Sequence, residues 1–173
     1  MALIVSPDPQ KLARGTLTCA DNAYVCALGR SGVSASKIEG DNTTPIGTFS
    51  LRQLFYRADR LALPATTLMT RAIERHDGWC DAPGDSHYNQ LITMPHPTSA
   101  ENLWREEHVY DLIVVIGYND APIVSGKGSA IFMHIATPDY APTAGCVALS
   151  QRDLLSVLQT LSPDPTITIQ AAR

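Results

Sequence analysis

A cysteine and a histidine in the last third of the chain have the side chains needed for nucleophilic catalysis. Cys146 directly follows Gly145, and His134 ends a strand-like apolar run twelve positions earlier. A thiol is mostly protonated at neutral pH, and an adjacent imidazole activates it by pairing with the thiolate. Gly145 permits a tight turn, in which the N–H groups of Ala144, Gly145 and Cys146 converge on an oxyanion. The pattern predicts acyl transfer with Cys146 as nucleophile and His134 as base.

Two other interpretations of these residue types stay open at this point. The first is purely structural: Cys146 is a small buried hydrophobe and His134 a hydrogen-bonded strand residue, and spacing alone does not decide against it. The second is a zinc site, because His76, Cys80 and His87 carry suitable donor atoms. The paired C-x-x-C of common zinc sites is missing there, so we expect no metal.

The elements that must position this pair are mostly strands. Apolar, β-branched runs with turn residues between them predict strands at 15–20, 23–28, 47–56, 110–118, 128–135 and 166–169. The first two form a predicted hairpin with Asp21-Asn22 as its turn. In that register Cys19 and Cys26 share a face only diagonally, which disfavours a disulfide.

One helix is expected after the cysteine. Ser150 and Asp153 resemble a capping box, and an apolar stripe follows until Pro163, made of Leu154, Leu155, Leu158 and Leu161. A second, weaker helical pattern covers about 64–75. The polar stretch 76–105 carries few strand or helix signals, and a loop of that length is typically a lid or a binding loop. The fold class is therefore mostly β (α+β), with one or two helices and a long loop insertion.

Composition limits the classes of function. With 173 residues, 45% of them hydrophobic, the chain suits a single domain over 1–173. A net charge of -4 and a pI near 5.6 provide no basic surface, so nucleic acid is not an expected partner. We expect no membrane span, since no apolar stretch approaches the required length of roughly 20 residues. No export signal is visible at the N-terminus, so a cytoplasmic location stays open.

Two motifs resemble the YkuD-type L,D-transpeptidases. Residues 37–49 contain Thr44-Pro45-Ile46-Gly47, which is similar to the early TP-x-G signature of that family, and the stretch from His134 to Cys146 is similar to its catalytic pattern. The resemblance extends over about residues 15–170. It implies a YkuD-like β-sandwich or barrel, with Cys146 as nucleophile, His134 as base, the backbone of Ala144 and Gly145 in the oxyanion hole, and the Ile135 carbonyl orienting the imidazole.

The resemblance also implies a substrate and a reaction. Peptidoglycan stem peptides would be acyl donor and acceptor, carbapenems would be candidate inhibitors, no cofactor would be needed, and the periplasm or cell envelope would be the site of action. The chain further resembles a compact proteobacterial branch, some of whose members form 1,3 rather than 3,3 cross-links. The residues expected to contact the stem peptide are Trp79, Tyr88, Asn89, Trp104, Arg105 and Thr143.

Departures from the family pattern leave alternatives open. Ala144 stands where relatives keep a second histidine, and Ala148 stands where they keep a polar residue. With water as acceptor, the same residues would give an L,D-carboxypeptidase or endopeptidase. The alternative that is not an enzyme is a non-catalytic module that binds the cell wall.

Overall fold

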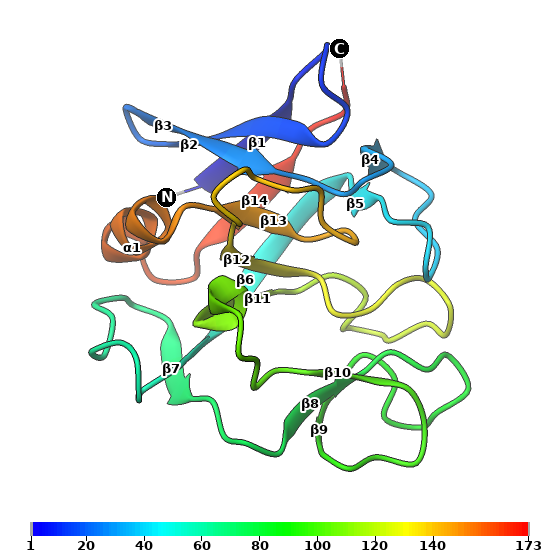
Figure 1. Cartoon of the computed structure of the whole chain (residues 1–173). Coiled ribbons are helices and arrows are strands. Elements are labelled where there is room, and N and C mark those ends of the chain that lie inside the picture. Colours follow the sequence, from blue (N-terminus) through cyan, green and yellow to red (C-terminus); the bar gives the residue numbers. More distant parts are fainter. Residues whose placement is uncertain (1, 173) are drawn as a thin grey trace.

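The computed structural model describes residues 2–172 and is built around one large sheet (Figure 1). Its strand order is β11-β12-β13-β3-β2-β1-β14-β6-β7. Because β6 also pairs with β11, eight of these strands close into a ring, and β7 extends it beside β6. The strands are β1 (Ala2–Pro7), β2 (Arg14–Cys19), β3 (Asn22–Ala27), β6 (Gly47–Tyr56), β7 (Met69–Ala72), β11 (Leu112–Ile116), β12 (Phe132–Ile135), β13 (Val147–Leu149) and β14 (Thr166–Ile169).

The helix α1 (Gln151–Thr160) follows β13 as the sequence predicts. The Ser150 hydroxyl accepts a hydrogen bond from the Asp153 N–H at 3.1 Å, which satisfies one of the free donors of the first turn. Leu154, Val157 and Leu158 are fully buried against the barrel. Among the described residues this is the single α-helix, and the mostly β fold class is confirmed; a short 3-10 turn, η1 (His108–Tyr110), precedes β11.

Alternating side chains divide β12 between two apolar clusters. Met133 and Ile135 point into the main cluster inside the barrel, whereas Phe132 belongs to a second cluster on the outer face. On β13 the same alternation sends Val147 and Leu149 inward, and the preceding Cys146 lies in the outer cluster. The outer cluster is therefore the layer on which a site can be built.

The segment 76–105 covers this outer face and is more ordered than the sequence predicts. It contains a small sheet of β8 (Asp77–Cys80), β9 (Leu91–Thr93) and β10 (Ala100–Asn102), which lies below β11 in Figure 1. These strands have three or four residues each, too short for a clear alternation in the sequence. A two-stranded pair, β4 (Val33–Ser34) and β5 (Thr44–Pro45), holds the start of the TP-x-G motif.

Two local predictions are wrong. The pattern at 64–75 forms no helix, since β7 pairs in parallel with β6 and this tertiary pairing overrides a weak local preference. The hairpin turn lies at Ala20-Asp21, with Cys19 opposite Asn22 and Cys26 opposite Gly15. Ala20 adopts a positive φ of 50°, which a motif based on Asp-Asn did not indicate. All four cysteines are buried.

Candidate active site

The pairing of β12 with β13 brings His134 and Cys146 to the same face. The two strands run parallel with His134 beside Ala148, so Cys146, two residues before Ala148, lies diagonal to the histidine. Both side chains line a cavity of about 630 Å³ between the barrel and the segment 76–105. The two residues that the sequence pairs therefore line the same cavity.

Cys146 is 6% exposed and makes its contacts with β12 and the residues before it. Its Sγ donates to the Ala130 carbonyl at 3.3 Å and accepts from the Phe132 N–H at 3.4 Å. Burial raises the pKa of the thiol to about 12, and the negative charge of Glu101 acts in the same direction. The resting side chain is thus a thiol.

His134 is held by its own strand. Its Nδ1 lies 2.9 Å from the Ile135 carbonyl, which can only accept, so Nδ1 carries the proton and Nε2 is the basic nitrogen. Burial lowers the pKa of His134 to about 4, against the opposing effect of the backbone carbonyls of Ile135 and Val109. The ring packs edge-on against Tyr110 with centroids 5.2 Å apart. In the described part of the chain no hydrogen bond joins Cys146 to His134, and catalytic contacts commonly tighten only when substrate binds.

The loop before the cysteine requires its glycine. Gly145 has a φ of +141°, and a Cβ at this position would lie 2.8 Å from the Thr43 carbonyl. Its N–H donates to the Thr143 hydroxyl at 3.1 Å, and the same hydroxyl donates to the Cys146 carbonyl at 2.7 Å. Thr143 therefore fixes the backbone around the cysteine.

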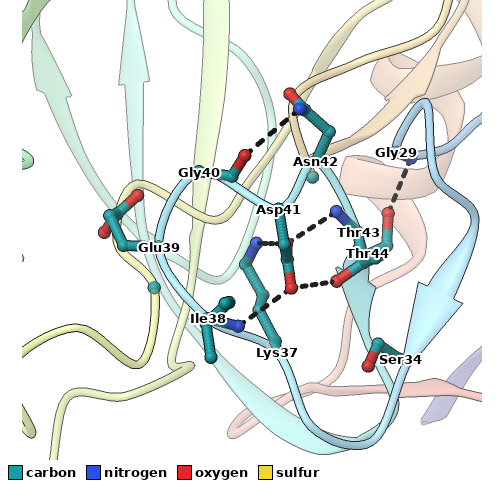
Figure 2. A network of polar contacts seen from close by, with 12 residues as sticks. Gly29, Ser34, Lys37, Ile38, Glu39, Gly40, Asp41, Asn42, Thr43 and Thr44 are labelled. Atoms are coloured by element: carbon teal, nitrogen blue, oxygen red, sulfur yellow. Dashed lines mark hydrogen bonds and ion pairs between the residues drawn. The ribbon is translucent and has the colours of Figure 1, made fainter.

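The TP-x-G motif contacts the loop that precedes Cys146. Thr44 is fully buried, and its hydroxyl accepts the Gly29 N–H at 2.8 Å (Figure 2). Gly29 in turn forms a bridge with Thr143. A side chain at Gly29 would meet the Asn42 carbonyl at 2.4 Å, so the two loops pack backbone to backbone. The motif thus has a physical role, which is to hold the cysteine loop in place.

Five acidic or basic side chains join the pair in the cavity lining, and the sequence assigned a role to only one of them, Arg105. Burial raises the pKa of the Glu101 carboxyl, while a hydrogen bond from Tyr110 and the charge of Arg105 oppose this shift. Arg105 donates to Glu101 at 2.7 Å and lies over the Tyr110 ring at 4.3 Å. The five are Lys37, Glu39, Asp81, Glu101 and Arg105. Lys37 and Glu39 lie within residues 37–49, the motif that carries the family resemblance. That motif was the signal from which the sequence could have indicated them as site residues.

Two of the six residues expected to contact the stem peptide, Arg105 and Thr143, line the cavity. The other four join the segment 76–105 to the barrel. Trp79 donates to the Asn89 side chain at 2.9 Å and packs edge-on against Phe132 at 5.2 Å. The Tyr88 hydroxyl donates to Glu39 and accepts the Gly128 N–H.

Asn89 and Trp104 also stabilise this segment. The Asn89 side chain donates to the Tyr118 and Asn119 carbonyls and accepts the Ala130 N–H. Two guanidinium groups lie over the Trp104 ring, that of Arg57 at 3.7 Å and that of Arg75 at 4.8 Å from its centroid. A role for these four residues in substrate binding stays a prediction.

The donor atoms that lie close together in the structure differ from those that the sequence suggested for zinc. Cys80, Asp85 and His96 place their donor atoms within 4.8 Å of one another, and neither His76 nor His87 belongs to this group. Asp85 already accepts hydrogen bonds from Thr98 at 2.6 Å and from the His87 N–H at 2.8 Å, and its carboxylate lies 3.0 Å from His96 Nε2. These contacts fasten the turn between β8 and β9 to the residues before β10.

The sequence profile of YkuD, the L,D-transpeptidase catalytic domain, matches residues 2–169. The chain therefore belongs to the YkuD family of L,D-transpeptidase catalytic domains, as the two motifs predict. No curated protein sequence matches it.

Solved structures with a similar chain path include the helical cell shape determining protein Pgp2 from Campylobacter jejuni, with 15% identity and a TM-score of 0.47 over 99% of this chain and 48% of that one. An L,D-transpeptidase from Mycobacterium smegmatis has 14% identity and a TM-score of 0.43 over 98% of this chain and 58% of that one. L,D-transpeptidase 1 from Mycobacterium tuberculosis has 15% identity and a TM-score of 0.40, with 98% and 59% covered. The chain spans about half to three-fifths of the length of these structures.

Proposed function

We propose that this chain is a cysteine-dependent L,D-transpeptidase that joins peptidoglycan stem peptides through a thioester on Cys146. The observation that carries the proposal is the placement of Cys146 and His134 on one face, inside one cavity, next to a glycine loop fixed by the TP-x-G motif. Membership in the YkuD family supports the same substrate class.

In the first half-reaction, His134 Nε2 takes the Cys146 proton and the thiolate attacks the acyl-donor carbonyl. A C–S bond forms, and the carbonyl π electrons move to oxygen. Because the Gly145 N–H is engaged by Thr143, the proposed oxyanion hole depends on the N–H groups of Ala144 and Cys146. Collapse breaks the C–N bond, the leaving amine takes the proton from His134, and a thioester stays on Cys146.

In the second half-reaction, an acceptor amine attacks the thioester. His134 takes a proton from that amine, the new C–N bond forms, and the C–S bond breaks as the proton returns to the thiolate. The Nδ1–H bond to the Ile135 carbonyl keeps the imidazole in the tautomer that both steps need. Every group in this cycle belongs to the chain or to the two peptides, so the proposed mechanism uses no cofactor.

Purified stem-peptide muropeptides test the proposal directly. Incubation with the wild-type chain should give cross-linked dimers detectable by mass spectrometry, and Cys146→Ala should give none. Fragmentation of the dimers distinguishes a 1,3 from a 3,3 link. Shortened monomers without dimers would instead identify an L,D-carboxypeptidase or endopeptidase on the same residues.

A carbapenem tests whether the domain is catalytic at all. We expect one covalent adduct on the intact wild-type protein and none on Cys146→Ala. No adduct on the wild type, or an adduct that survives the substitution, would favour the non-catalytic wall-binding alternative.

The proposed substrate lies in the cell envelope, so we propose the periplasm or cell envelope as the site of action. Within the described residues, no helix is long and apolar enough to cross a membrane.

A further inference from the structure

We propose that Lys37 is an electrostatic positioning residue for the reaction, whose ammonium group lies beside the Gly145–Cys146 loop and stabilises the anion that forms on Cys146. The inference rests on the proposed function. It gives a role to a buried charge that the Cys-His pair alone leaves unexplained.

Lys37 is a buried cation, with its side chain only 3% exposed. Its Nζ donates to Asp41 Oδ1 at 2.9 Å. A lysine with no role beyond a solvent-exposed loop would extend its ammonium into water, since burial of a charge is costly without a specific partner. The position of this charge is therefore defined by the fold.

Asp41 fixes that position through several hydrogen bonds (Figure 2). Its carboxylate accepts the Ile38 N–H at 2.9 Å, the Thr43 N–H at 2.8 Å and the Thr43 hydroxyl at 2.9 Å, in addition to the lysine. Burial acts to raise the pKa of Asp41, but these hydrogen bonds outweigh it and lower the value to about 2. The carboxylate is thus ionised throughout the neutral range and forms an ion pair with Lys37.

The ammonium lies directly beside the loop that carries the nucleophile. A Cβ built on Gly145 would be 3.3 Å from Lys37 Nζ, and a Cβ on Gly128 would be 2.8 Å from Lys37 Cε. Lys37 lines the same cavity as Cys146 and His134, whereas Asp41 is not among the lining residues. The ammonium therefore lies beside the cysteine loop, and its counter-ion is not part of the cavity lining.

Among the other charged groups around Cys146, only Arg105 acts in the same direction. Glu101 raises the pKa of Cys146, while Arg105 lowers it but is paired with that same Glu101 at 2.7 Å. Tyr110 donates to Glu101, and burial keeps its pKa well above the ordinary value, so it stays neutral. His134 is neutral near pH 7, because burial lowers its pKa to about 4.

Glu39 and Asp81 are the other carboxylates of the lining, and Glu39 accepts hydrogen bonds from Tyr88 and Ser129. Lys37 is therefore the cation whose partner lies outside the cavity, and its charge lowers the pKa of Cys146. Transfer of the thiol proton leaves a negative charge close to this ammonium.

The test is the rate of Cys146 alkylation by iodoacetamide between about pH 7 and 9, followed by mass spectrometry of the peptide that contains Cys146. In Lys37→Met, which keeps the length of the side chain, and in Lys37→Gln, which can still donate to Asp41, alkylation should be roughly tenfold slower, as expected for a rise of about one unit in the pKa of the thiol. Lys37→Arg, which keeps the charge, should stay near the wild-type rate.

Two further variants separate charge from structure. Glu101→Gln removes a negative charge from the same cavity and should make alkylation faster. Lys127→Met removes an exposed lysine of the neighbouring loop and should leave the profile unchanged. A merely structural role for Lys37 would not give shifts of opposite sign for opposite charges.

An unchanged alkylation rate in either uncharged Lys37 variant that retains the wild-type circular dichroism spectrum would overturn the inference. If neither variant folds, slower or unchanged alkylation in Glu101→Gln overturns it instead. The carbapenem adduct on the wild type keeps the two proposals distinguishable: without that adduct the proposed function fails, whereas an adduct together with unchanged alkylation profiles removes only the role of Lys37.

Discussion

The inside of the barrel and the outer face of β12 and β13 each hold a buried cysteine, Cys26 and Cys146. Burial raises the pKa of both thiols to about 12, and neither is more than 6% exposed. Cys26 packs in the main apolar cluster opposite Gly15, whereas Cys146 lines a cavity together with His134 and charged residues. Burial and pKa alone therefore do not distinguish these two cysteines; the side of the sheet on which each lies does.

The largest effect should come from the glycine that shapes the outer loop. Gly145→Ala places a Cβ against the Thr43 carbonyl at a positive φ, which we expect to cost about 1–3 kcal/mol of unfolding free energy. Displacement of the nucleophile should lower cross-linking activity by about 100-fold or more. Urea unfolding and muropeptide assays measure both. Gly84→Ala is the control, because a Cβ there meets nothing within 4 Å; equal behaviour of the two variants would contradict the role of the glycine loop.

The next effect concerns the buried histidine of the outer face. Because burial lowers the pKa of His134 to about 4, below the unfolded value near 6.5, the unfolded chain binds the proton more tightly. Stability from this group is complete above about pH 6.5 and is lost as the pH falls toward 4, by roughly 2–3 kcal/mol. Urea unfolding at pH 7 and 4.5 should show this loss in the wild type and not in His134→Gln. Parallel losses in both proteins would refute the assignment.

A pair of matched substitutions compares the two regions through single hydrogen bonds. Thr44→Val leaves the buried Gly29 N–H without its acceptor beside the site and should cost about 1–3 kcal/mol. Ser150→Ala removes the cap of α1 on the barrel side and should cost about 1 kcal/mol. Only Thr44→Val should also reduce carbapenem acylation when both proteins are folded. Equal acylation would show that the TP-x-G motif supports the fold without positioning the cysteine.

The smallest effect is expected inside the barrel. Cys26→Ala removes one buried sulfur and should cost about 1 kcal/mol without changing carbapenem acylation. Thermal unfolding and intact-protein mass spectrometry measure the two quantities. Loss of the adduct in a folded Cys26→Ala protein would break the distinction between the two cysteines.

Strong periodic signals predicted much of the fold. The capping pattern at Ser150 and the apolar stripe after it predicted α1, and the run at 47–56 predicted β6. Short or edge strands were not predicted. β8, β9 and β10 are too short to show a period, and β7 depends on β6 as its partner. The hairpin register was wrong because Ala20 adopts a positive φ, which its residue type does not indicate.

The sequence by itself determined which atoms could react and in which order their motifs occur: a thiol after a glycine, an imidazole at the end of a strand, and a TP-x-G signature before both. Only the tertiary structure decided which groups surround them. The register of β12 and β13 puts Cys146 and His134 on one face, and the loop from Lys37 to Thr44 brings a buried ammonium beside Gly145. The physical reason is that residue type fixes donor and acceptor chemistry locally, whereas burial, charge pairing and distance arise from contacts between segments about a hundred residues apart.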